Sequence, residues 1–96
     1  MKDKLLQIIN HYGIGNQLKY FQSEVFELNE AVINAETFSK IYGEMEEYDL
    51  KHIAEEIADV LVMLKQIQLY YKISSEEIKE VAQYKIDRQL ERIKEE

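Results

Sequence analysis

The sequence predicts an all-α fold in a single domain, and three observations support this prediction. The 96 residues contain no proline and only three glycines, so few residues would interrupt a helix. The glycines are Gly13, Gly15 and Gly43, and each stands where the apolar pattern breaks. Between the breaks, apolar residues recur every three or four positions, which is the period of an amphipathic helix. We therefore expect residues 1–96 to form one helical bundle.

The first two expected helices flank the Gly13-Ile14-Gly15 segment. Residues 3–12 form the first, because apolar residues keep helical spacing up to the break. Residues 16–36 form the second, with the a/d rhythm of a bundle helix. Its stripe consists of Leu18, Phe21, Val25, Leu28 and Val32. Residues 37–47 are expected to be a connection with one or two helical turns and a helix stop at Gly43.

The third expected helix, residues 48–72, is the longest and the most apolar. One face carries Ile53, Ile57, Val60, Leu64, Ile67 and Tyr71. Apolar residues also lie around the rest of this helix, so we expect it to be buried on more than one side. The fourth helix begins at Ser74, because Ser74 and Glu77 have capping-box spacing and Ile73 and Ile78 can form a hydrophobic staple.

The length of the chain favours assembly with further copies. A 96-residue chain buries only about 60–65% of the surface that its unfolded state exposes. A helix that is apolar on several sides adds to the surface that needs a cover. We therefore expect two long antiparallel helices in each chain and a homo-oligomer, either a homodimer or a homotetramer.

The composition excludes several classes of partner. Nineteen acidic and 12 basic residues give a net charge of −7, which opposes binding to a nucleic-acid polymer or an anionic membrane surface. The absence of cysteine excludes disulfides, thiolate metal sites and a thiol nucleophile. No apolar run suits a signal peptide or approaches the roughly 20 residues that span a bilayer. These features predict a cytoplasmic protein that binds no membrane.

One charged residue, Asp59, stands inside the apolar stretch EEIADVLVML of residues 55–64. Burying an unpaired charge costs several kcal/mol or more. Glu56 lies three residues earlier, so the two carboxylates project side by side from a helix. Glu24 and Glu27 repeat this spacing on the second helix. If the two helices pack antiparallel, the four carboxylates can converge at their seam.

Four converging carboxylates raise one another's pKa values unless a cation joins them. Oxygen ligands without His or Cys favour Mg²⁺ first, then Mn²⁺ or Ca²⁺. The alternative is that these acidic residues are solvated edges of amphipathic helices, because carboxylates at this spacing are common in a chain that is 32% charged. The expected burial of Asp59 favours the metal.

These two acidic pairs resemble the MazG-like all-α nucleoside triphosphate pyrophosphohydrolases. SEVFELNEAV and EEIADVLVML are similar to the two motif helices of that family, and the resemblance covers about residues 17–92. Ser23 is a departure, since many members have a glutamate there, and we interpret it as a change in the outer shell or in metal stoichiometry. The resemblance implies a Mg²⁺-dependent enzyme of nucleotide-pool clean-up. It would cleave a nucleoside triphosphate between the α and β phosphates to give the monophosphate and pyrophosphate. Glu24, Glu27, Glu56 and Asp59 match its metal ligands.

A basic stripe on the fourth helix is the candidate site for the departing pyrophosphate. Lys85, Arg88 and Arg92 are spaced i, i+3, i+7, and such side chains suit phosphate. The surrounding residues resemble the family's basic motif, although Gln89 stands where asparagine is common. The alternative is that these bases complement the helix dipole and pair with neighbouring acids. Gln17 is a candidate for reading a base or sugar, with helix capping as the alternative.

Two further functions stay open. The chain could be a catalytically silent helical oligomerisation module, with its acidic pairs in solvent or in interchain salt bridges. It could also bind metal and nucleotide without turnover. A di-iron site is excluded, because Asp49-x-x-His52 supplies one half-site and the only other histidine is His11. An oligomerisation module gains nothing from a buried carboxylate, so the expected burial of Asp59 favours a metal enzyme.

Overall fold

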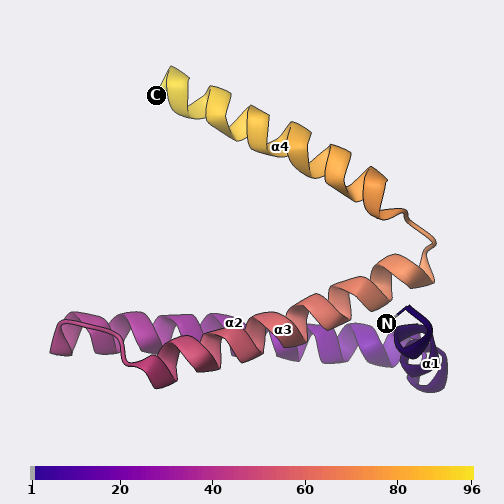
Figure 1. Cartoon of the computed structure of the whole chain (residues 1–96), viewed down its shortest axis with the longest axis horizontal. Helices are drawn as coiled ribbons and strands as arrows, with labels where there is room; N and C mark the ends of the chain where they lie inside the picture. The colour runs from indigo at the N-terminus through magenta and orange to yellow at the C-terminus, as the bar shows by residue number, and fades with distance from the viewer. Residues whose placement is uncertain (1) are drawn as a thin grey trace.

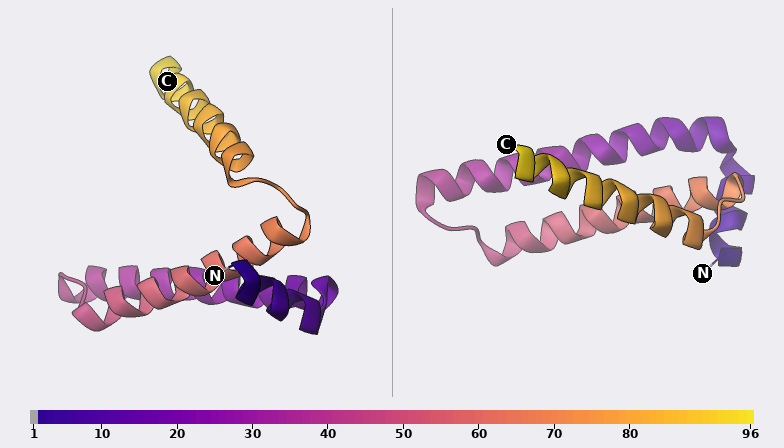
Figure 2. Two further views of the ribbon diagram at one scale, coloured as in Figure 1. Left: turned by 45° about the vertical axis from the view of Figure 1, so that its right-hand side comes forward. Right: turned by 90° about the horizontal axis from the view of Figure 1, so that it is seen from above.

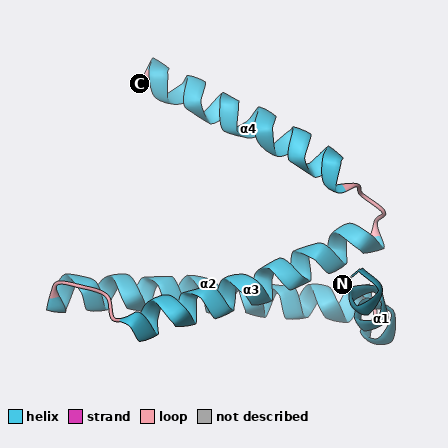
Figure 3. Ribbon diagram, in the orientation of Figure 1, coloured by secondary structure: helices cyan, strands magenta, loops and turns pink. Residues whose placement is uncertain are grey.

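The computed structural model describes residues 2–96, and every element in them is a helix (Figures 1 and 3). The helices are α1 (Lys2–Tyr12), α2 (Ile14–Tyr42), α3 (Glu47–Tyr70) and α4 (Ser75–Glu95). The prediction of an all-α fold is confirmed. None of these helices is both long enough and apolar enough to cross a membrane in the described part of the chain.

The break between α1 and α2 is a single residue. Gly13 adopts a φ of 86°, a left-handed conformation that favours glycine, and α2 begins at the next residue. Gly15 lies inside α2, so the expected three-residue break is shorter than predicted. One residue with positive φ is enough to redirect the chain between two helices.

Helix α2 is longer than expected and ends at Tyr42. The prediction that it stops at residue 36 is wrong, because residues 37–42 contain no helix breaker and Thr37 fits into the helix. Its hydroxyl donates to the carbonyl of Ile33 at 2.8 Å. The predicted stop at Gly43 is confirmed: Gly43 has a φ of 94°, and its N–H donates to the Ser39 carbonyl.

Local hydrogen bonds set the ends of α3 and α4. At the start of α3, the Glu46 N–H donates to Asp49 Oδ2 at 3.2 Å, a cap that the sequence pattern did not suggest. The predicted cap at Ser74 is confirmed, since the Glu77 N–H donates to Ser74 Oγ at 3.1 Å, although the reciprocal bond of a capping box is not found there. Between the two helices, Lys72 has a positive φ of 57°, which ends α3 before the next helix begins.

Three helices form the packed part of the molecule. Helices α2 and α3 lie side by side and are joined by residues 43–46, while α1 packs against both at one end (Figures 1 and 2). The buried apolar side chains are Leu5, Ile9, Ala31, Ala35 and Met63.

The predicted apolar stripes do not form the seam between α2 and α3. Part of each predicted stripe is exposed, namely Leu18, Val32, Ile57, Leu64 and Tyr71. The buried positions of α2 include Gln17, Glu24 and Ala31, spaced seven residues apart. On α3 they are Met63 and Gln66. Both helices are therefore rotated about their axes relative to the expectation, and polar residues fill the seam.

Helix α4 projects away from the other three helices (Figures 1 and 2). Only its first residue is tied to α3, because Lys65 Nζ and Gln68 Nε2 both hydrogen-bond to Ser75 Oγ, at 3.1 and 3.0 Å. Every residue of α4 is exposed. Beyond this first residue, no other helix of the described chain packs on α4.

Candidate metal centre

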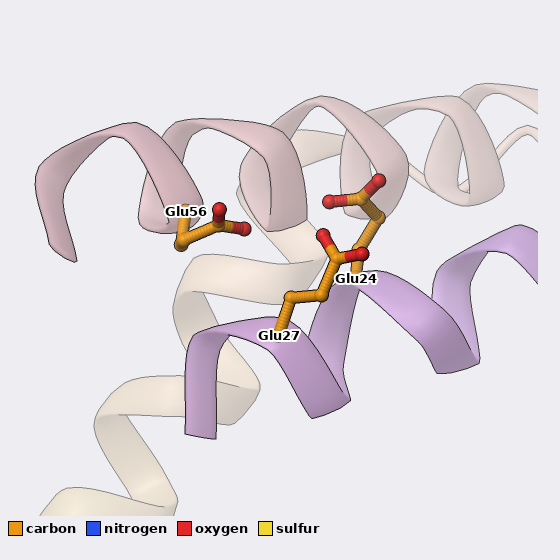
Figure 4. A group of neighbouring side chains, drawn as sticks. All are labelled: Glu24, Glu27 and Glu56. Atoms are coloured by element: carbon orange, nitrogen blue, oxygen red, sulfur yellow. The ribbon is translucent and has the colours of Figure 1, made fainter. Parts of the chain in front are cut away.

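Three carboxylates meet where α2 faces α3. Glu24 and Glu27 come from successive turns of α2 and Glu56 comes from α3, as Figure 4 shows. One oxygen atom from each carboxylate lies within 4.8 Å of the others. The i,i+3 spacing places both α2 carboxylates on the side that faces α3. We call these three residues the carboxylate cluster.

Two oxygen atoms of the cluster are buried without a hydrogen-bond partner among the described residues. They are Glu24 Oε2 and Glu56 Oε2. The Glu24 side chain is buried, with 6% of its surface exposed. Such oxygens are rare in folded proteins, because an unsatisfied buried polar group costs about 1–3 kcal/mol and a charged one costs more. A hard divalent cation fits this donor set, since it would satisfy both oxygens.

The electrostatics of the cluster also favour a cation. Burial is the main cause that raises the pKa of Glu24, and the negative charges of Asp59 and Glu27 raise it further. The Tyr20 hydroxyl opposes that rise, and the charge of Glu24 in turn raises the pKa of Tyr20. No lysine or arginine forms an ion pair with the cluster among residues 2–96, where the salt bridge found is Lys94 with Glu91.

Asp59 lies close to the carboxylate cluster but is not one of its three members. Its side chain is exposed, so the expectation that Asp59 is buried is wrong for the single chain. Asp59 shares a helical stripe with Met63 and Gln66, at positions i, i+4 and i+7, but only Met63 and Gln66 are buried. Burial of a carboxylate is instead found at Glu24. Asp59 still acts on the site, because it lines a cavity together with Glu24.

That cavity, of about 510 Å³, opens next to the cluster. Its size falls in the range of about 300–1,000 Å³ that is usual for small-molecule sites. Its walls combine apolar side chains, two tyrosines, amides and carboxylates. The lining residues are Ile8, Tyr12, Asn16, Gln17, Tyr20, Glu24, Asp59, Val62, Met63 and Gln66.

A buried pair of amides forms part of this lining. Gln17 Nε2 donates to Gln66 Oε1 at 2.8 Å, and the two residues are 8% and 2% exposed. The other bond of Gln66 is a weak one, from Nε2 to Met63 Sδ at 3.8 Å. No hydrogen bond reaches Gln17 Oε1 from the described residues, so an acceptor remains for a ligand.

The alternative role of Gln17 as a helix cap is not observed. Helix α2 has no side-chain cap at its start, and the Gln17 amide turns into the seam instead. Asn16 bonds locally, because its Nδ2 donates to the carbonyl of Tyr12 at 2.8 Å and so ties the end of α1 to α2.

The basic residues predicted to bind pyrophosphate lie away from the cluster. Lys85, Arg88 and Arg92 belong to α4, which packs against neither α2 nor α3. Within one chain, they therefore do not join the carboxylates. His52 does lie near: it stacks on Tyr48 and lines a cavity of about 260 Å³ with Glu27 and Glu56.

Sequence reasoning missed Gln66 as a site residue. The signal in the sequence was weak, because Gln66 stands between Lys65 and Ile67 in a stretch where polar residues recur. The proximity of Tyr20 to Glu24 was also missed, although Tyr20 stands one helical turn before Glu24 in the sequence.

Comparisons of the chain with protein-family models, with curated proteins and with solved structures found no match in any of the three.

Proposed function

We propose that the protein is a Mg²⁺-dependent nucleoside triphosphate pyrophosphohydrolase that releases a nucleoside monophosphate and pyrophosphate. The observation that carries this proposal is the pair of buried, unpartnered carboxylate oxygens beside a cavity of small-molecule size. The resemblance of the two acidic motifs to the MazG-like family supports the same reaction. A role in clearing nucleotides from the cytoplasmic pool follows from that reaction.

Glu24, Glu27 and Glu56 would hold the ion, with Mn²⁺ as a substitute for Mg²⁺. Asp59, at the edge of the cavity, would complete the set from the substrate side. When bound, the metal lowers the pKa of a water molecule and neutralises charge on the phosphates. The carboxylates would hold that ion in the seam, next to the cavity that would receive the substrate.

The cavity would receive the base and sugar of the substrate. Tyr12 and Tyr20 offer ring faces for stacking, while Ile8 and Val62 exclude water from the base. Gln17 Oε1 would accept a hydrogen bond from a ring N–H or an exocyclic amine. Gln66 holds the Gln17 amide in place through the buried bond between them. Binding of the base therefore orients the triphosphate toward the carboxylate cluster.

Assembly is part of the proposed function. We take α2 and α3 as the antiparallel pair that carries the two motifs, and the active protein as a homodimer or homotetramer. Twenty-four large apolar side chains are exposed among residues 2–96, whereas five apolar residues are buried, and this imbalance supports an oligomer. Light scattering at micromolar concentration tests this point, and a monomeric mass would contradict it.

Product analysis tests the reaction directly. The protein is incubated with a panel of nucleoside triphosphates and Mg²⁺, and the products are separated by ion-exchange chromatography. We expect a monophosphate and pyrophosphate in equal amounts, and no product after a chelator is added. Release of orthophosphate with a nucleoside diphosphate would contradict the assignment.

A silent oligomerisation module is the second candidate, and the exposed apolar side chains favour it. The buried carboxylate oxygens oppose it, because an oligomerisation module does not need them. Clear Mg²⁺ binding without turnover of any nucleotide would instead indicate a protein that binds metal and nucleotide. The absence of both binding and turnover would indicate the module.

A further inference from the structure

Tyr20 lies between the cavity and the carboxylate cluster. It belongs to α2 and stands four residues before Glu24, so the two side chains are neighbours on one face of the helix. It lines the cavity of about 510 Å³ together with Glu24 and Asp59. Its hydroxyl interacts with the Glu24 carboxylate as a hydrogen-bond donor. One side chain therefore touches both the cavity and a proposed metal ligand.

The Glu24 carboxylate needs a contact that fixes its orientation. The outermost torsion of a glutamate side chain is broad, so the plane of an unrestrained carboxylate turns easily. Residues that bind metals are commonly held by a hydrogen bond from an outer group, and loss of that group weakens metal binding. Among residues 2–96, the side chain that interacts with Glu24 in this way is Tyr20. Tyr20 is therefore the residue placed to orient this ligand.

The contact leaves an oxygen of Glu24 free for a cation. Glu24 Oε2 is buried and has no hydrogen-bond partner among the described residues. One oxygen from each of Glu24, Glu27 and Glu56 lies within 4.8 Å of the others, and Figure 4 shows the three side chains together. The Tyr20 hydroxyl can therefore hold the carboxylate while an oxygen remains available inside the cluster.

The electrostatics of the pair act in the same direction. Burial is the main cause that raises the pKa of Glu24, and the Tyr20 hydroxyl opposes that rise because it favours the ionised carboxylate. The ionised carboxylate is the form that binds a cation. The charge of Glu24 is in turn the main cause that raises the pKa of Tyr20, so the hydroxyl keeps its proton and remains a donor.

The ring of Tyr20 is separate from this contact. The residue is 57% exposed, so it is not part of the packed core. Tyr20→Phe removes the hydroxyl and keeps the ring at the wall of the cavity. The fold should therefore tolerate the change, and the role of the hydroxyl can be measured apart from stacking of the ring on a base.

We propose that Tyr20 is a positioning residue whose hydroxyl orients Glu24 for a divalent cation, while its ring lines the cavity that receives the base. The role of the ring rests on the proposed function. The role of the hydroxyl is tested by metal binding alone, without turnover of a nucleotide.

A titration with Mn²⁺ tests the role of the hydroxyl. Electron paramagnetic resonance measures free Mn²⁺ in the presence of wild type, Tyr20→Phe or Tyr12→Phe, and so gives a Kd for each. We expect Tyr20→Phe to bind Mn²⁺ about tenfold more weakly, as when an outer group of a metal ligand is lost. Tyr12→Phe is the matched control and should bind as wild type does, because Tyr12 lines the same cavity from α1.

Three results of this titration would overturn the proposal. The first is an equal Kd for wild type and Tyr20→Phe. The second is an equal loss of affinity in Tyr20→Phe and Tyr12→Phe, because any hydroxyl of the cavity would then have the same effect. The third is that the wild type binds no Mn²⁺.

Unfolding in urea without metal distinguishes positioning from a structural role. We expect the metal-free Tyr20→Phe protein to unfold at the same urea concentration as wild type. A lower midpoint of unfolding would show that the hydroxyl stabilises the fold itself, and it would overturn the proposal.

Kinetics with Tyr20→Leu separate the ring from the hydroxyl. Both Tyr20→Phe and Tyr20→Leu should need more Mg²⁺ for half-maximal activity. At saturating Mg²⁺, we expect Tyr20→Leu alone to raise the KM for the nucleotide, because it alone lacks the ring. Equal KM values for the two variants would overturn the role of the ring.

These measurements separate failure of the positioning role from failure of the proposed function. If Tyr20→Phe binds Mn²⁺ more weakly but the wild type turns over no nucleotide, the proposed function fails and the role of the hydroxyl stands. If turnover is normal and Tyr20→Phe binds Mn²⁺ as wild type does, the function stands and the positioning role fails.

Discussion

The seam between α2 and α3 and the surface of α4 show opposite mismatches between polarity and burial. In the seam, the buried residues include Gln17, Glu24 and Gln66, which are polar. On α4, the apolar residues are exposed. Each mismatch is costly for an isolated chain, because buried carboxylates lack partners and apolar side chains face water. A cation and a polar ligand would satisfy the buried polar groups of the seam, whereas another protein surface would cover the apolar side chains of α4.

The largest effect should come from the seam. Glu24→Gln keeps the shape of the side chain and removes its charge, so the cation loses a buried ligand. We expect kcat/KM to fall about 100-fold or more, as when a group that stabilises charge in the transition state is removed. Glu36→Gln is the matched control, because Glu36 is an exposed glutamate on the same helix.

Neutral substitutions on α4 should have the next largest effect. Lys85→Gln together with Arg88→Gln removes the positive charge expected at the departing pyrophosphate. Hydrogen bonds to charged groups contribute about 1.5–3 kcal/mol, so we expect kcat/KM to fall roughly ten- to 100-fold. Lys79→Gln, on the same exposed helix, is the control. Equal activity of the double variant and the control would mean that the basic stripe only complements the helix.

A smaller effect is expected at the amide pair. Gln17→Leu removes the free acceptor and leaves Gln66 without its partner, so base selectivity should weaken. We expect the ratio of kcat/KM between the preferred nucleotide and the next best to fall about tenfold. The same substitution should leave Mg²⁺ affinity unchanged, because Gln17 is not a metal ligand. Unchanged selectivity would show that the base binds elsewhere.

The smallest effect is on the stability of the metal-free protein. Burial raises the pKa of Glu24 from its ordinary value of 4.5, so the folded state binds this proton more tightly than the unfolded state does. Protonated Glu24 therefore stabilises the folded state fully at a pH below the ordinary pKa. This contribution is lost as the pH rises through the raised pKa of the folded state. In urea titrations at several pH values, Glu24→Gln should therefore become more stable relative to wild type as pH rises. A difference that is independent of pH would contradict the raised pKa.

Local patterns in the sequence predicted where the helices lie more accurately than they predicted which helix faces contact one another. Ser74 and Gly43 mark helix ends through hydrogen bonds to residues a few positions away, so the sequence alone predicted both ends. The burial of Glu24 and the exposure of Asp59 depend on the rotation of α2 against α3. Spacing alone left that rotation open, because α3 has two apolar sides. No local pattern in the sequence predicted that α4 lies away from the carboxylate cluster.

The central claim is that the carboxylate cluster binds a divalent cation, and thermal unfolding with and without Mg²⁺ tests it most directly. A cation that binds only the folded protein adds about 2.7 kcal/mol to the free energy of unfolding at 100 times its Kd. We therefore predict that Mg²⁺ raises the Tm of the wild type and of Glu36→Gln, and that Glu24→Gln loses most of the rise. An equal rise in Glu24→Gln and wild type, or no rise in any of them, would contradict the claim.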